Sequence, residues 1–135
     1  DKIVSYLGLQ ENNEEIINKI IKLDNYISKE TVNIVEDLKS KKINVYSLGT
    51  GKYIINQYPL KDNLVEEGSK VFLVTNSKDY IMENVIGWSL NEISTYANLI
   101  GLKLNTSGYG YVTEQSIEIG SPIESGMELN VTLTK

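Results

Sequence analysis

Three residue types that carry much of protein chemistry are missing from this sequence. The 135 residues include no cysteine, no histidine and no arginine. Cysteine nucleophiles, histidine-containing catalytic triads and the usual zinc sites of cysteine and histidine are therefore excluded. We expect no catalytic residue, no metal ion and no cofactor in this chain.

The scarcity of positive charge and of long apolar runs excludes two further classes. All 13 basic residues are lysines, and with 18 acidic residues the formal net charge is −5. Without guanidinium forks or an excess of positive charge, a nucleic-acid partner is not expected. No run of about 18 apolar residues occurs, so we expect no membrane span in this sequence. Residues 1–10 lack the cationic start and apolar centre of a signal peptide, so any targeting segment is expected outside the chain.

What the chain does contain is an internal repeat. Residues 23–76 align with residues 82–134 when a single one-residue insertion is allowed at a glycine-containing turn. The matched pairs include Asn25 with Asn84, Ile34 with Ile93, Gly49 with Gly108, Gln57 with Gln115, Gly68 with Gly126, and Leu73 with Val131. The sequence therefore predicts two similar modules in tandem.

The second copy has the clearest pattern of secondary structure. Ser89 and Glu92 have the spacing of a capping box, and apolar residues then recur at helical spacing as far as Ile100. Gly101 follows, where the end of a helix favours a left-handed backbone. Residues 129–134 alternate between apolar and polar side chains, as a half-buried strand does. The predicted fold class is α+β, with two small tandem modules, each one α-helix packed on a three-stranded antiparallel β-sheet.

The first copy departs from this pattern at two places. Lys42 stands where the second copy has Gly101, so either Lys42 adopts a left-handed backbone at a cost of about 1–2 kcal/mol or the junction differs. Phe72 and Val74 make both faces of the last strand apolar, which predicts that both faces are covered. The covering element could be a helix predicted over residues 12–22, the second repeat, or a neighbouring domain. Because the connection at 76–81 is short, we expect the two modules to touch.

The second copy resembles a PASTA domain. The matching residues are Gly87, Glu92, Gly101, Leu102, Val112, Gln115, Gly120, Gly126, Leu129 and Val131. Glu83 and Ile117 stand where that family has proline. In the first copy, Gln57 and Pro59 keep the glutamine and proline of the family pattern, whereas Asp24 and Ser28 replace its first proline and glycine. The resemblance predicts a divergent PASTA domain at 23–76 and a second at 82–135.

The resemblance implies two kinds of parent protein. PASTA repeats occur in class B penicillin-binding proteins and in bacterial Ser/Thr kinases, and residues 1–10 resemble the end of a transpeptidase domain. Residues 1–22 are therefore interpreted as the end of that domain plus a helical linker. Transpeptidase signatures such as Ser-x-x-Lys and Lys-Thr-Gly are absent from this sequence, so the fragment itself is not expected to be an enzyme.

This resemblance implies a non-catalytic, extracytoplasmic module on the cell-surface side of a membrane-anchored parent. It would support or localise the transpeptidase in peptidoglycan synthesis. Implied partners are the adjacent transpeptidase domain, peptidoglycan or muropeptide, and proteins of division or sporulation. The alternative is the muropeptide-sensing extracellular region of a Ser/Thr kinase.

The stretch GYGYVTEQ at 108–115 allows two interpretations. In the structural one, which we favour, its glycines permit a tight turn between strands. In the functional one, Trp88, Tyr109 and Tyr111 form an exposed aromatic platform for a sugar ring or stem peptide, with Gln115 beside them. Trp88 is the strongest surface candidate, because Lys29 replaces it in the first copy. These four residues are the predicted ligand-binding set.

Overall fold

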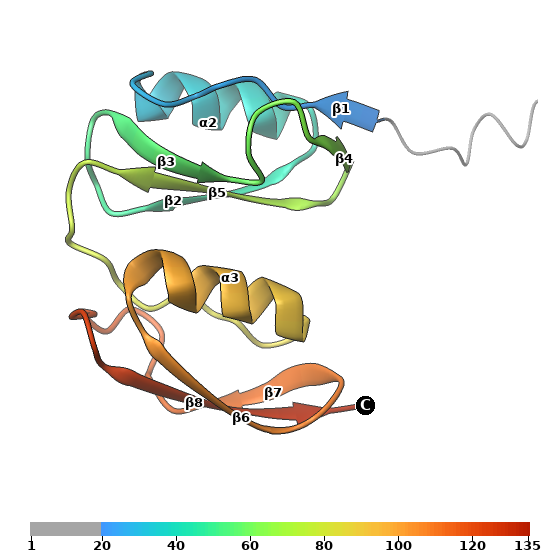
Figure 1. The fold of residues 1–135 in the computed structure, drawn as a ribbon, viewed down its shortest axis with the longest axis vertical. Coiled ribbons are helices and arrows are strands. Elements are labelled where there is room, and N and C mark those ends of the chain that lie inside the picture. Colours follow the sequence, from blue (N-terminus) through green and yellow to red (C-terminus); the bar gives the residue numbers. More distant parts are fainter. Residues whose placement is uncertain (1–19) are drawn as a thin grey trace, which may run out of the picture.

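A computed structural model describes residues 20–135 as four stacked layers. From one end to the other they are a helix, a sheet, a second helix and a second sheet (Figure 1). The first module, residues 20–76, supplies the first two layers, and the second module, residues 80–135, supplies the others. The elements in chain order are β1 (Ile20–Lys22), α2 (Thr31–Ser40), β2 (Asn44–Leu48), β3 (Ile54–Tyr58), β4 (Leu64–Glu66), β5 (Lys70–Thr75), α3 (Leu90–Ile100), β6 (Lys103–Gly108), β7 (Tyr111–Gln115) and β8 (Glu128–Thr134).

Each module is a helix over a three-stranded sheet, which confirms the predicted fold class, but the sheets are not wholly antiparallel. The strand orders are β2-β5-β3 and β6-β8-β7. The last strand of each module is parallel to the first strand and antiparallel to the second. The prediction of antiparallel sheets was wrong because the two strands joined by the glycine turn do not pair with each other. The last strand lies between them, and since they run in opposite directions it must be parallel to one.

The two sheets agree in their details as well as in their order. Val45 pairs with Val71 in the first sheet, as Leu104 pairs with Leu129 in the second. The second strand of each sheet in chain order carries a register shift at the equivalent place, between Ile54 and Asn56 in β3 and between Val112 and Glu114 in β7. The alignment made from the sequence is therefore also an alignment of backbone pairings.

The helix ends follow the residues predicted to set them. The Ser89 side chain accepts a hydrogen bond from the Glu92 N–H, and the Glu92 side chain accepts one from the Ser89 N–H, so the capping box is present. Gly101 ends α3 with a left-handed φ of 79°. At the end of α2, Lys42 has a φ of 63°, so the first module keeps the same junction with a residue that is strained there.

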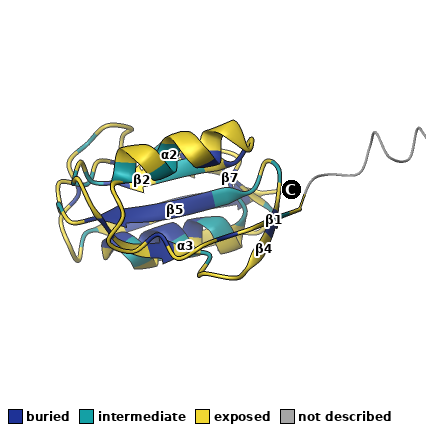
Figure 2. Ribbon diagram, turned by 90° about the horizontal axis from the view of Figure 1, so that it is seen from above, coloured by how far each residue is buried: buried dark blue, intermediate teal, exposed yellow. Residues whose placement is uncertain are grey.

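The first module has its own core, whereas the core of the second extends across the junction between modules. Leu38, Ile54, Val71 and Leu73 belong to the first core. The second core includes α3 and the second sheet, and it also takes in Leu48, Phe72 and Val74 from the first sheet. The second repeat therefore covers the outer face of β5, one of the three predicted possibilities, and β5 is buried along most of its length (Figure 2).

Strand β1 corrects the prediction of a helix over residues 12–22. Residues Ile20–Lys22 form a short strand that pairs antiparallel with Leu64–Glu66. In this pairing Ile21 packs against the first core, while Ile20 is exposed. Alternate residues on opposite faces are what a strand provides and a helix does not. The remainder of the predicted helix, and the predicted end of a transpeptidase domain, lie outside the described residues.

Candidate functional site

Trp88 lies in the junction between the modules. Its side chain is only 4% exposed, so the prediction of a surface tryptophan was wrong. The indole ring centroid is 5.2 Å from that of Tyr46, 5.8 Å from Phe72 and 5.4 Å from Tyr96. The presence of Lys29 at this place in the first copy had suggested that the core does not need the tryptophan, but Trp88 belongs to the core of the second module. Its side chain also contacts residues of the first sheet and so joins the two modules.

Gln115 is bonded to the backbone of its own module. Its Oε1 accepts a hydrogen bond from the Val85 N–H at 3.0 Å, and its Nε2 donates to the carbonyl oxygens of Glu83 and Ile117. Gln57 makes the same three kinds of contact in the first module. The amide thus ties the chain before each helix to the end of the second strand, and its polar atoms are occupied by the fold.

Tyr109 and Tyr111 lie on the exposed surface of the second module. They are 69% and 59% exposed, respectively. The glycine turn that carries Tyr109 crosses the end of β8: a Cβ atom on Gly108 would overlap the carbonyl oxygen of Leu133, and one on Gly110 would overlap that of Thr134. The glycines therefore serve the close approach of two backbone segments. The predicted platform loses Trp88 and keeps only these two rings.

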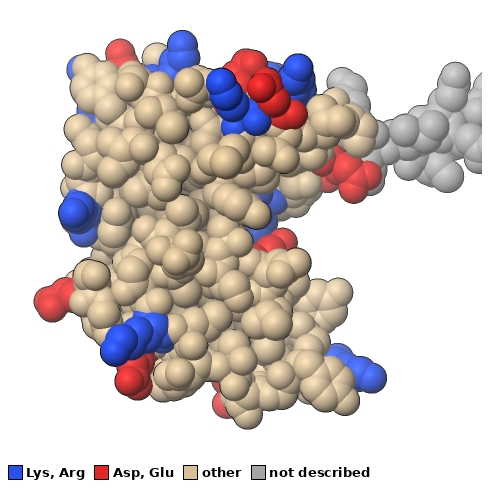
Figure 3. Space-filling view, viewed as in Figure 1, with Lys and Arg blue, Asp and Glu red and all other residues tan. Residues whose placement is uncertain are grey.

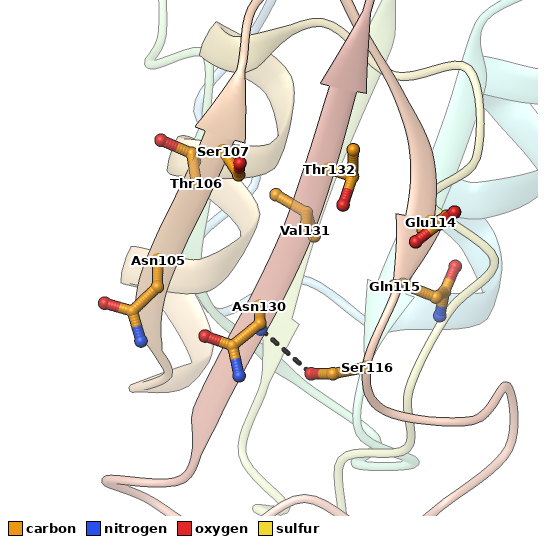
Figure 4. Close-up of a pocket in the computed structure, with 9 residues that line it drawn as sticks. All are labelled: Asn105, Thr106, Ser107, Glu114, Gln115, Ser116, Asn130, Val131 and Thr132. Atoms are coloured by element: carbon orange, nitrogen blue, oxygen red, sulfur yellow. Dashed lines mark hydrogen bonds between the residues drawn. The ribbon is translucent and has the colours of Figure 1, made fainter.

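The outer face of the second sheet is polar and open. Asn105 on β6 pairs with Asn130 on β8, and their amides lie side by side in Figure 4. The Asn130 N–H donates to the Ser116 hydroxyl at 2.9 Å, and a shallow depression of about 280 Å³ runs along these strands. The equivalent face of the first sheet carries Phe72 and Val74 and is covered by α3. The second sheet therefore ends the stack with a solvated surface.

A groove lies between the two modules on one side of the junction. We call it the junction groove; its lining includes Tyr58, Lys70, Phe72, Asn91, Glu92 and Thr95, and its volume is about 390 Å³. In the space-filling view the molecule is hollowed between its two halves, with basic and acidic side chains inside the hollow (Figure 3). Clefts between domains are common ligand sites. Sequence reasoning did not find this groove, because its two walls belong to different modules.

Charge in the junction groove is balanced by one ion pair. The Lys70 Nζ lies 3.1 Å from a Glu92 carboxylate oxygen and 5.5 Å from the Trp88 ring centroid. Partial burial acts to raise the pKa of Glu92, but hydrogen bonds from the Ser89 N–H and Lys70 outweigh it and hold that pKa below its ordinary value. The Glu92 carboxyl group is therefore ionised at neutral pH, and its negative charge is offset by the neighbouring Lys70.

The connection between modules is fixed by Asp79. Its carboxylate accepts hydrogen bonds from the Thr50 N–H at 2.8 Å, from the Thr50 hydroxyl, and from the Ser77 hydroxyl at 2.6 Å. Bonds from the Ser77 and Thr50 side chains lower the pKa of Asp79 to about 2. The connection is thus held against the glycine turn of the first module.

Two features are absent from the described part of the chain. Within residues 20–135, no group of three or more acidic side chains is placed to hold a metal ion. No helix in that range is long and apolar enough to cross a membrane.

Comparisons with known proteins match a family over the second module and a fold over most of the chain. The sequence pattern of the PASTA domain family matches residues 80–135. The crystal structure of penicillin binding protein 2X from Streptococcus thermophilus aligns with 94% of this chain at a TM-score of 0.76 and 19% identity. That alignment covers 19% of the penicillin binding protein, so this chain spans about a fifth of its length. The three-PASTA-domain structure of a Ser/Thr kinase from Staphylococcus aureus aligns with 87% of the chain and 66% of its own, at a TM-score of 0.37 and 17% identity. No curated protein sequence matches the chain.

Proposed function

Since residues 80–135 match the PASTA domain family, we propose that this chain is a non-catalytic, wall-associated part of a penicillin-binding protein. In this proposal the first module is a divergent PASTA domain, and the pair supports or localises a transpeptidase domain during peptidoglycan synthesis. The parent is anchored in the membrane, and both modules lie on its extracytoplasmic side.

The junction between the modules is the observation that carries the proposal. Phe72, Val74, Trp88 and Tyr96 are buried where the first sheet meets α3. Such an interface joins two small modules into one body rather than leaving them to move independently. The similarity to penicillin binding protein 2X supports the proposal because it extends over both modules and the junction, with 94% of this chain aligned.

The glutamine contacts support a common origin for the two modules. Gln57 and Gln115 accept and donate equivalent hydrogen bonds in the two modules. A side-chain amide that satisfies three backbone groups is costly to replace, because its loss leaves those groups without their partner. This constraint explains why the glutamine persists in the divergent first copy.

Contact with peptidoglycan is the second part of the proposal. The net charge of −5 does not favour capture of an anionic wall polymer, so we expect weak contact with uncharged parts of the wall. Of the four residues predicted as ligand-binding, Tyr109 and Tyr111 are the two with exposed rings. Proteins of division or sporulation remain the proposed partners of the parent.

The parentage can be tested on the full-length parent protein. If it is a penicillin-binding protein, fluorescent penicillin should label it, and deletion of residues 20–135 should leave the label but disturb its location or stability in the cell. The present chain alone should not be labelled. An unlabelled parent with a kinase domain and a membrane span before the repeats would contradict the proposal and favour the kinase alternative. Labelling within residues 20–135 would contradict their non-catalytic role.

A further inference from the structure

The junction groove exists because α3 covers only part of the first sheet. Tyr58 on β3 pairs directly with Phe72 on β5, so their side chains lie on the same face of the sheet. Phe72 is buried under α3, whereas Tyr58 is 48% exposed. The floor of the groove is therefore an aromatic surface that begins in the core and ends in solvent.

The opposite wall of the groove is polar. Asn91, Glu92 and Thr95 come from the first turns of α3. Among residues 20–135, no hydrogen bond holds the Asn91 amide, the Thr95 hydroxyl or the Tyr58 hydroxyl. The groove thus offers one exposed aromatic face and several hydrogen-bonding groups that remain available to a ligand.

We propose that the junction groove binds a sugar ring of an uncharged glycan. This inference rests on the proposed function and assigns glycan contact to the junction rather than to the Tyr109 turn. An aromatic ring suits the apolar face of a sugar, while amide, hydroxyl and carboxylate groups suit its hydroxyls. The volume of about 390 Å³ lies within the roughly 300–1,000 Å³ usual for small-molecule sites.

Charge in the groove selects an uncharged ligand over an ionic one. Lys70 and Glu92 neutralise each other at 3.1 Å, so an anion drawn to the lysine would also meet the carboxylate. The hydroxyls of a neutral ligand can accept a hydrogen bond from Lys70 and donate one to Glu92 without breaking the ion pair. A zwitterionic peptide would have to separate them to bind both.

Trp88 provides a direct signal for binding. It is the only tryptophan in the chain, and its buried ring centroid lies 5.5 Å from the Nζ of Lys70, which lines the groove. We would titrate the protein with chitotetraose, a neutral glycan, and in parallel with trialanine, a zwitterion, and follow tryptophan fluorescence. The expected result is a saturable change at millimolar chitotetraose and none with trialanine.

Variants then locate the site. Tyr58→Ala should weaken binding of chitotetraose by about tenfold, the scale of one lost aromatic contact, whereas Tyr58→Phe should retain most of it. Asn91→Ala should weaken binding by a few-fold. Tyr53→Ala removes a similarly exposed ring that does not line the groove and should leave binding unchanged. Tyr109→Ala and Tyr111→Ala test the glycine turn as the competing site. Because Tyr58 is half-exposed, its replacement should not unfold the protein, which thermal denaturation would verify.

Three outcomes would overturn the inference. They are the absence of a saturable change, a response to trialanine of the same size, and loss of binding in Tyr109→Ala or Tyr111→Ala but not in Tyr58→Ala. None of these bears on penicillin labelling of the parent. Failure of the junction groove as a site is therefore distinguishable from failure of the proposed function.

Discussion

The two modules should separate if the apolar residues on the outer face of the first sheet are replaced by the polar residues of the second sheet. Phe72→Asn and Val74→Thr together place on β5 the residues that β8 carries as Asn130 and Thr132. The side chains of Phe72 and Val74 pack against the second module, whereas Val71 and Leu73 point into the first core. The double variant should therefore weaken the junction while both modules keep their folds.

The size of the effect follows from burial. Phe72 and Val74 are 2% and 4% exposed. Full burial of each is worth about 1.5–3 kcal/mol, so the pair contributes roughly 3–6 kcal/mol to the contact. Each 1.4 kcal/mol corresponds to a tenfold change in an equilibrium, so the separated state should gain at least about 100-fold in population.

Two measurements would detect the separation. NMR relaxation should give separate rotational correlation times for the modules, and fluorescence should show Trp88 in contact with water. Leu64→Asn combined with Val32→Thr is a matched control, because both residues are exposed apolar side chains of the first module. The control should change stability by no more than about 0.5 kcal/mol. A junction variant that tumbles as one body with Trp88 still buried would contradict this prediction.

Three further predictions concern single residues. Lys42→Gly should relieve the left-handed strain at φ 63° and stabilise the protein by up to about 1 kcal/mol, while Gly101→Ala should destabilise it by about 1–2 kcal/mol; thermal denaturation of both would check this, and stabilisation by the alanine would contradict it. Gln115→Ala removes three hydrogen bonds to the backbone and should lower the free energy of unfolding by about 2–4 kcal/mol in urea denaturation, so a loss below 1 kcal/mol would mean that water replaces the amide. Asp79 has a pKa lowered to about 2, so its contribution to stability is present above the ordinary carboxyl pKa and is lost as pH falls towards 2; Asp79→Asn should flatten the dependence of stability on pH in that window, and an unchanged pH profile would refute the assignment.

Much of the fold could be predicted from residues close together in the chain. The capping box at Ser89 and the left-handed residue at Gly101 are set within one or two turns of the helix. The apolar residues on both faces of β5 also predicted that another part of the structure covers Phe72 and Val74. The repeat was also visible in the sequence, through matched residues such as Gln57 and Gln115.

The candidate site was predicted less well, for a reason visible at Tyr58. It is half-exposed beside Pro59 in a stretch that reads as the end of a strand. Nothing in its neighbourhood indicates that Asn91 and Thr95, more than 30 residues later, form the facing wall. Because the two walls of the groove come from different modules, their residues form no motif with a fixed spacing in the sequence.

The sequence by itself determined the modules: the helices, the turns, the repeated glutamine and the need to cover β5. Tertiary structure alone decided that β8 lies between β6 and β7 and that Trp88 is buried against Phe72. Helical spacing, caps and turns depend on neighbours within a few residues, so they are written in short stretches of sequence. Strand order and the packing of modules depend on which surfaces, far apart in the sequence, bury the most apolar area together. These contacts exist only in the folded chain.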